Sequence, residues 1–213
     1  MSYKNIITHY ENCFNKHGDS PAGVDWTQPQ QVDIRYKVML ELINFKESSF
    51  NINGKRTLLD YGCGLSHLYQ YILEHNIDYI TYTGLEISNI FYVQSKQKYP
   101  NNNYLLGDIL HKNYTLERSY EYIIMNGVFT EKRDLSHQEM FNYFSDMITK
   151  LYRSCTKGIA FNVMSKQVEW EKDFLFHVPL DDMANFLTKK ITRNFVIRND
   201  YGLYEYTVYL YKG

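Results

Sequence analysis

The 213-residue chain has few cysteines, no long apolar run and almost no net charge. Its cysteines, Cys13, Cys63 and Cys155, are odd in number and widely spaced, so they form neither a disulfide framework nor a paired metal-binding motif. No run of about 18 apolar residues is present, so no membrane span is expected. With a formal net charge of −1, the chain has no overall positive charge that would attract a nucleic acid, so electrostatics gives no reason to expect such a partner.

Targeting signals and low-complexity tracts are also lacking. The first residues have no apolar stretch of the kind that forms the core of a signal peptide. Together with unpaired cysteines, this predicts a cytoplasmic protein. Hydrophobic residues make up 44% of the chain, which is enough for the core of a single domain.

The apolar pattern changes near residues 53–54. Before that point, a polar and aromatic stretch precedes one helix, for which Thr27 is a candidate cap and Pro29 suits the first turn. The apolar stripe of this helix consists of Val32, Tyr36, Met39, Leu40 and Ile43. We expect residues 1–53 to form a helical lid or extension and residues 54–213 to form the main domain.

After residue 54 the patterns of strands and helices alternate, which is typical of an α/β protein with a mainly parallel sheet and helices on both faces. The last two strands are joined by a turn at residues 199–202, without a helix, so the final strand should run antiparallel. Ser136 and Glu139 form a capping-box pattern. The expected strands are 57–61, 80–86, 103–107, 121–128, 158–164, 191–198 and 203–212, and the expected helices are 65–75, 88–98, 136–152 and 180–190.

Candidate binding residues follow the first two strands. Ligands of open α/β sheets bind beyond the carboxyl ends of the strands. The first strand leads through Asp60 into a turn with Gly62 and Gly64, where glycine lets the backbone approach a ligand closely. The second strand ends at Glu86, at about the 20-residue interval that brings an acid to a ribose in nucleotide-binding folds.

The next two strand ends carry Asp108 with Ile109, and Asn126 with Gly127. The first of these pairs suits the edge and face of an adenine. A dinucleotide fingerprint would have a third glycine where this chain has His67, and no Gly-Lys-Ser/Thr phosphate loop follows the turn. The site therefore suits an adenosine without phosphates.

Each acid alone also has an ordinary structural explanation. Asp108 could cap a turn, and Glu86 could be a solvated strand end. Their occurrence at successive strand ends favours the binding site.

This ordered set resembles the class I S-adenosylmethionine-dependent methyltransferases over about residues 55–213. The resemblance is carried by "LLDYGCGLSHL", the acid at Glu86, the "GD" at Asp108 and the terminal hairpin. It implies a Rossmann-like, seven-stranded sheet with an antiparallel seventh strand, and S-adenosyl-L-methionine as the cofactor. The residues it assigns to the cofactor are Asp60, Gly62 and Gly64 at the methionine part, Glu86 at the ribose, Asp108 at the adenine amine, and Asn126 and Gly127 near the transferring end. Ile87 and Ile109, the neighbours of the two acids, are further candidate cofactor contacts.

The segments "HYENCFNKHGDSPAGVDW", "QQVDIRY", "NGVF", "FNVMS" and "DYGLYEYT" further resemble a bacterial branch of the superfamily that acts mostly on small molecules. This implies methyl transfer to an O or N atom of a small molecule, such as a sugar or a secondary-metabolite intermediate. "NGVF" lacks both prolines of the "NPPY/F" loop of enzymes that methylate nucleic acid bases, which disfavours base methylation.

Methyl transfer from a sulfonium depends mainly on alignment of acceptor, methyl group and sulfur. A base is needed only if the acceptor loses a proton early. His137, at the capped start of a helix, and His177, expected in the loop after the fifth strand, are the candidate bases. Tyr10 in the lid and Arg35, suited to the carboxylate of the cofactor, complete the candidate cofactor contacts. Arg35 could equally lie on a solvated helix face.

Other functions stay open. They are a nucleic-acid or protein methyltransferase, a nicotinamide oxidoreductase, and a non-catalytic module that binds S-adenosylmethionine. We expect a small-molecule acceptor as partner, with no metal, nucleic acid or membrane, and the sequence does not specify an oligomeric state.

Overall fold

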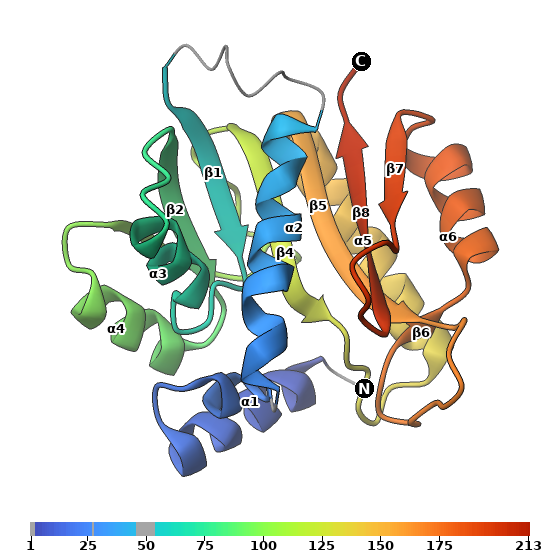
Figure 1. Cartoon of the computed structure of the whole chain (residues 1–213), viewed down its shortest axis with the longest axis horizontal. Coiled ribbons are helices and arrows are strands. Elements are labelled where there is room, and N and C mark those ends of the chain that lie inside the picture. Colours follow the sequence, from blue (N-terminus) through green and yellow to red (C-terminus); the bar gives the residue numbers. More distant parts are fainter. Residues whose placement is uncertain (1–2, 27, 46–53) are drawn as a thin grey trace.

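A computed structural model describes residues 3–26, 28–45 and 54–213. The expected helix cap at Thr27 and the expected boundary at residue 53 lie outside these residues. Within the described residues, eight strands form one sheet, and seven of them follow the order β3-β2-β1-β4-β5-β8-β7 (Figure 1). Their bounds are β1 (Arg56–Tyr61), β2 (Ile80–Glu86), β3 (Asn103–Leu106), β4 (Tyr120–Phe129), β5 (Cys155–Ser165), β6 (His177–Val178), β7 (Phe195–Arg198) and β8 (Glu205–Tyr211).

The antiparallel final strand is confirmed. Strands β1 to β5 pair in parallel, whereas β8 is inserted between β5 and β7 and runs antiparallel to both. The expected seven strands form the continuous path of the sheet, and the two residues of β6 add a short pairing to the end of β5. His177 therefore belongs to a strand and not to a loop. The expected strand 191–198 begins only at Phe195, because a π-helical turn, η4 (Leu187–Ile191), precedes it.

Helices cover the sheet and its carboxyl edge. They are α1 (Lys4–His17), α2 (Val32–Asn44), α3 (His67–Glu74), α4 (Asn89–Lys98), α5 (His137–Ser154) and α6 (Leu180–Phe186), with short 3₁₀ turns η1 (Pro21–Val24) and η2 (Pro29–Gln31). The capping box of Ser136 and Glu139 is confirmed at the start of α5. Helix α1 was not expected from the sequence. In the described part of the chain, no helix combines the length and the apolar character needed to cross a bilayer.

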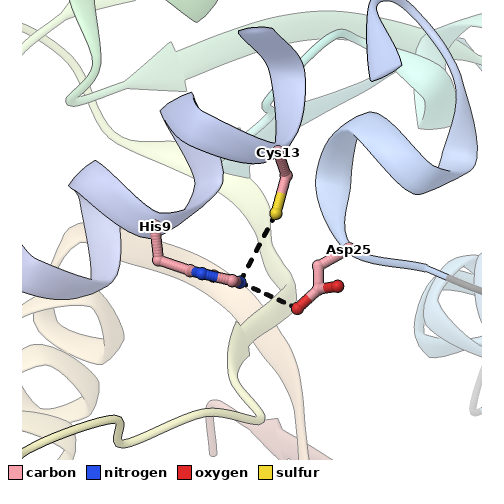
Figure 2. Close-up of side chains that lie close together, drawn as sticks. All are labelled: His9, Cys13 and Asp25. Carbon is pink, nitrogen blue, oxygen red and sulfur yellow. Dashed lines mark hydrogen bonds and ion pairs between the residues drawn. The ribbon is translucent and has the colours of Figure 1, made fainter. Parts of the chain in front are cut away.

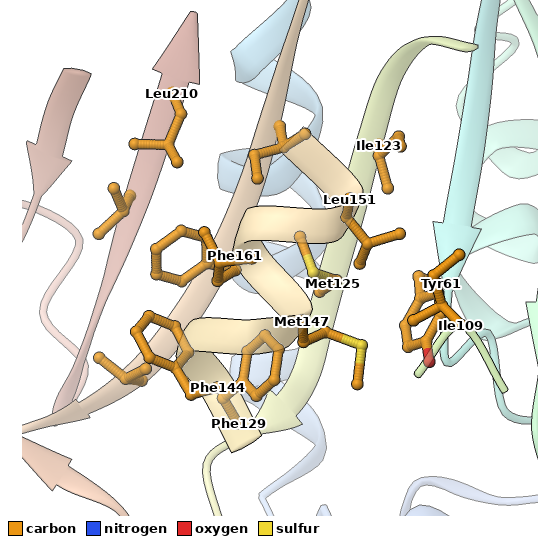
Figure 3. Packing of buried hydrophobic residues seen from close by; sticks show 14 of the residues in the cluster. Tyr61, Ile109, Ile123, Met125, Phe129, Phe144, Met147, Leu151, Phe161 and Leu210 are labelled. Carbon is orange, nitrogen blue, oxygen red and sulfur yellow. The ribbon is translucent and has the colours of Figure 1, made fainter. Parts of the chain in front are cut away.

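The two faces of the sheet build two separate cores, because side chains alternate along a strand. On β4, Ile123 and Met125 pack on the face that α5 covers, together with Phe144 and Leu151 of that helix (Figure 3). Tyr122 and Ile124 pack on the opposite face with α2 and α3. The expected stripe of α2 is buried in this second core, so α2 is part of the sheet packing.

Helix α1 lies across the ends of the strands. In Figure 1 it crosses beyond the arrowheads of β1 and β4, on the edge where the parallel strands end. The fold thus places an N-terminal helix over the edge of the sheet where ligands bind in open α/β proteins.

Candidate functional site

A cavity opens at the carboxyl ends of β1, β2 and β4 and holds about 1040 Å³ of empty space, its open mouth included. The strand ends line it with seven of the predicted residues, namely Asp60, Gly62, Gly64, Glu86, Ile87, Asn126 and Gly127. The N-terminal region contributes the predicted Tyr10 together with Tyr3, Ile6, Val24 and Trp26.

The glycine turn after β1 is shaped by close backbone approach. Gly62 has φ +73°, and a Cβ there would lie 2.7 Å from Cγ2 of Val128. Only glycine avoids both the left-handed strain and this clash. The turn directs the backbone N–H of Gly64 toward the end of β2.

Glu86 receives three backbone hydrogen bonds in the cavity wall. Its Oε2 accepts from the N–H of Gly64 at 2.8 Å, and its Oε1 accepts from the N–H groups of Ile87 and Ser88 at 2.8 and 2.9 Å. Burial raises the pKa of this carboxyl, and the three N–H donors oppose that shift. A carboxylate has about four acceptor positions, so capacity remains for a hydroxyl of a ligand.

Asp60 is a buried acid at the bottom of the same turn. Its Oδ2 accepts a hydrogen bond of 2.7 Å from the hydroxyl of Tyr82. Burial raises the pKa of Asp60 to about 7, the Tyr82 hydroxyl lowers it in part, and the charge of Glu86 raises it further. Asp60 is therefore poised between its neutral and ionised forms near neutral pH.

The predicted adenine pair does not line the cavity, judged over the described residues. Ile109 is 1% exposed and belongs to the core under α5. The carboxylate of Asp108 accepts hydrogen bonds from the hydroxyl of Tyr3 and from the N–H of Leu110. The ring of Tyr3 in turn stacks on Tyr143, with 4.8 Å between centroids. Tyr3 and Tyr143 thus form the cavity wall in front of Asp108.

Asn126 and Gly127 line the cavity at the end of β4. Both polar atoms of the Asn126 side chain are buried, and neither has a hydrogen-bond partner within the described part of the chain. Buried amides in native proteins nearly always have partners, so Asn126 has the character of a ligand-binding group. Gly127 has φ +80°, and a Cβ there would lie 3.2 Å from the ring of Trp26.

A buried hydrogen-bond network behind the cavity wall supports the backbone of Gly127. Its N–H donates to Oδ1 of Asn162 at 2.8 Å, and Nδ2 of Asn162 donates to Oε1 of Glu205 at 2.8 Å. Nε of Arg35 donates to Oε2 of Glu205 at 3.0 Å. Arg35 is thus paired inside the protein, 5.2 Å from the ring centroid of Trp26, and it is not among the described residues that line the cavity.

The roles of Asn162 and Glu205 were not expected from the sequence. Both occur in segments that carried the bacterial resemblance, "FNVMS" and "DYGLYEYT". Nothing local marks them as partners, because they lie on the neighbouring strands β5 and β8 and are 43 positions apart in the sequence. Tyr143, on the half-buried side of α5, carried no signal either.

The two candidate bases lie elsewhere. Nε2 of His137 is 3.0 Å from the carbonyl oxygen of His177, and Nδ1 of His177 is 2.6 Å from the carbonyl oxygen of Ser165. Neither histidine is among the described residues that line the cavity. The structure therefore does not bring them together with the strand-end residues.

Comparison with known proteins identifies the fold. No protein-family model matches the sequence, and neither does any curated protein. Solved structures match over the whole chain. Magnesium protoporphyrin IX methyltransferase (ChlM) from Synechocystis PCC 6803 with bound SAM is 16% identical, with a TM-score of 0.63, over 100% of this chain and 98% of that one.

Two further methyltransferase structures agree. The plantazolicin methyltransferase BamL is 12% identical, with a TM-score of 0.65, over 99% of both chains. An S-adenosylmethionine-dependent methyltransferase from Clostridium acetobutylicum ATCC 824 is 11% identical, with a TM-score of 0.56, over 99% of both chains. The expected Rossmann-like methyltransferase fold is thereby confirmed.

Proposed function

We propose that this chain is an enzyme that transfers the methyl group of S-adenosyl-L-methionine to an O or N atom of a small molecule. The observation that carries the proposal is Glu86, a buried carboxylate at the end of β2 that faces the cavity and is anchored to the glycine turn of β1. The structures that share the fold are methyltransferases, one of them with bound SAM.

The residues around the cavity suit this cofactor. Glu86 would accept hydrogen bonds from the ribose hydroxyls, and Asp60 would lie beside the positively charged methionine part. The unpartnered amide of Asn126 would bind near the transferring end. Asp60 and Glu86 are hydrogen-bond acceptors, and Asn126 adds one amide. A phosphate would need a cluster of N–H donors and a lysine instead.

The cofactor would supply an activated methyl group on a sulfonium, and the protein would supply alignment and a dry site. Tyr10 and Trp26 cover the strand ends, so they would exclude water from the reacting groups. The network behind Gly127 would fix the backbone beside the transferring end. Positioning of this kind accounts for much of the acceleration that a displacement reaction needs.

The acceptor would be small and largely apolar on at least one face. The wall opposite the strand ends consists of Tyr3, Ile6, Tyr10 and Trp26, and aromatic rings bind sugars and planar rings by their faces. The net charge of −1 gives the chain no overall electrostatic attraction to nucleic acids.

A methyl-transfer assay tests the proposal. The purified protein is incubated with S-adenosylmethionine that carries a labelled methyl group and with a panel of hydroxylated, amino and carboxylated small molecules. We expect labelled product from at least one class, and its loss in Asn126→Ala. Cofactor binding without transfer to any acceptor, nucleic acid or protein would identify a non-catalytic module instead.

A further inference from the structure

Outside the cavity, three side chains of different chemistry converge on one point (Figure 2). His9 and Cys13 lie one turn apart on α1, and Asp25 follows η1. Nε2 of His9 is 2.8 Å from Oδ2 of Asp25 and 3.5 Å from Sγ of Cys13. All three atoms lie within 4.8 Å of one another.

We propose that His9, Cys13 and Asp25 form a divalent metal site suited to Zn²⁺. Imidazole nitrogen, thiolate sulfur and carboxylate oxygen are the three ligand types that zinc takes in proteins. Zinc bonds of about 2.0 Å to nitrogen and 2.3 Å to sulfur, at a tetrahedral angle, put those two ligand atoms about 3.5 Å apart. This is the separation between His9 and Cys13. The nitrogen and oxygen of two ligands would be about 3.3 Å apart, so Asp25 needs only a small shift outward.

The backbone arranges these ligands before any ion arrives. Residues four apart on a helix share a face, so His9 and Cys13 both point toward η1. Asp25 adopts φ +57° at the end of η1, a left-handed conformation that costs free energy in a residue other than glycine. Its N–H donates to the carbonyl of Ala22 at 3.1 Å. The backbone of the turn therefore orients the Asp25 carboxylate toward α1 independently of its contacts with His9 and Cys13.

Arg133 is the cation that an entering metal must replace. Its Nη2 contacts Nε2 of His9 and lies 3.1 Å from Oδ2 of Asp25. Its Nε forms an ion pair of 2.5 Å with Glu131, and its guanidinium lies 5.1 Å from the ring centroid of Phe174. These last two contacts can hold Arg133 after Nη2 has moved away.

Charge favours the exchange. One guanidinium carries a single positive charge against Asp25 and the nearby Glu131, whose Oε2 is 3.8 Å from Nε2 of His9. A divalent ion brings two charges and binds Cys13 as the thiolate, and the thiol proton is released to solvent as the bond to the ion forms. Three protein ligands leave a fourth position for water or, after a further shift, for Glu131.

The site would join α1 to the turn of η1. Tyr10, which lines the cavity, is the chain neighbour of His9, and Val24 and Trp26 flank Asp25. A metal bound here would fix both parts of the cover over the cavity relative to each other. This inference rests on its own three side chains and does not depend on the proposed methyl transfer.

Cobalt titration tests the site, because Co²⁺ replaces Zn²⁺ and absorbs visible light according to its geometry. The full chain is treated with a chelator, freed of it, and titrated with Co²⁺. We expect saturable tetrahedral bands at one ion per chain, a thiolate-to-cobalt charge-transfer band in the near ultraviolet, and loss of both on adding Zn²⁺.

Four variants identify the ligands. Cys13→Ser should abolish the charge-transfer band and weaken Co²⁺ binding by about tenfold or more, the loss that even a ligand-supporting residue causes. His9→Ala should remove the tetrahedral bands. Cys155→Ser, a change at a buried cysteine at the start of β5, away from the carboxyl ends of the strands that α1 covers, should leave the titration unchanged. Arg133→Gln, which removes the competing cation, should tighten binding.

Two results would overturn the proposal. One is the absence of saturable absorption in both the wild-type chain and Arg133→Gln, which would leave the cluster as an ion network around Arg133. The other is an octahedral spectrum that persists in Cys13→Ser, which would mean adventitious surface binding. Titration with S-adenosylhomocysteine on the same samples reports separately on the methyltransferase assignment.

Discussion

The carboxylate of Glu86 accepts a hydrogen bond of 2.8 Å from the backbone N–H of Gly64, which ties the end of β2 to the turn after β1. One buried side chain thus shapes the turn and also faces the cavity.

Glu86→Gln replaces one acceptor oxygen by an NH₂ group that cannot accept from a backbone N–H. We expect the affinity for S-adenosylhomocysteine to fall by about 1.5–3 kcal/mol, the range for hydrogen bonds to a charged group. Isothermal titration measures this. Glu74→Gln is the matched control, because Glu74 is exposed on α3 and its hydrogen bond is to Gln70. Unchanged affinity in Glu86→Gln would limit Glu86 to holding the turn.

The buried Asp60 predicts a pH dependence of stability. Its pKa in the folded protein is about 7 because of burial, whereas in the unfolded chain it is about 3.9. Between these values the unfolded chain releases the proton and the folded protein retains it, so rising pH removes stability over this window. Asp60→Asn stays neutral, so it should gain stability relative to wild type between about pH 4 and pH 7, with no further gain above.

Urea unfolding of the empty protein at about pH 5 and about pH 8 measures the difference. The gain in the free energy of unfolding of Asp60→Asn over wild type should be larger at the higher pH. An equal difference at both values would mean that Asp60 ionises freely in the fold.

Glu205→Gln should destabilise the fold, because it leaves the guanidinium of Arg35 partly buried and without its ion pair. The side chains of Arg35 and Glu205 are 16% and 3% exposed. Breaking a buried pair costs about 3–5 kcal/mol, and the partial exposure of Arg35 favours the lower end. The double variant Arg35→Gln/Glu205→Gln should lose less than the sum of its single changes.

The surface pair of Lys166 and Glu171 is the matched control, since its side chains are 44% and 45% exposed. Glu171→Gln should cost less than about 1 kcal/mol. Urea unfolding is measured for Glu205→Gln, Arg35→Gln, the double variant and Glu171→Gln. If Glu205→Gln lowered the free energy of unfolding as little as Glu171→Gln does, the hydrogen-bond network behind Gly127 would not stabilise the fold.

Helix α1 should gain order when a ligand fills the cavity, because Tyr3, Ile6 and Tyr10 would contact it. We expect slower hydrogen exchange over residues 3–26 in the presence of S-adenosylhomocysteine. The chain has two tryptophans, so Trp170→Phe isolates the fluorescence of Trp26, which should shift in parallel. Tyr3→Phe, which loses the hydrogen bond to Asp108, should speed exchange of α1 in the empty protein. Equal exchange with and without ligand would reduce α1 to structural packing.

The sequence predicted elements that carry local signals. The stripe of α2, the capping box at Ser136 and the strand ends at Asp60 and Glu86 are all visible in short windows, because burial, capping and glycine turns are local requirements. Helix α1 has basic residues in its last turn and Gly18 as its C-cap, but it lacks the signals that mark a helix start. Tyr3 at its start makes no side-chain cap, and its first turn has no acid. The two-residue β6 exists only through its pairing with β5.

Contacts between distant segments could not be predicted. Arg35 was expected at the cofactor, but Glu205, 170 positions later, pairs with it. Asp108 was expected to meet an adenine directly, but Tyr3, 105 positions earlier, donates to its carboxylate. Arg35 and Asp108 could each pair with a cofactor group or with a side chain of the protein. The packing of α1 and α2 on the sheet determines which side chains they meet.

The proposed function requires that the cavity at the ends of β1, β2 and β4 bind S-adenosylmethionine. Isothermal titration of the purified chain with S-adenosylhomocysteine and, separately, with NAD tests it most directly. We predict micromolar binding of S-adenosylhomocysteine that Glu86→Ala weakens, and no measurable binding of NAD. Tight binding of NAD, with no heat or thermal stabilisation from S-adenosylhomocysteine, would contradict the account.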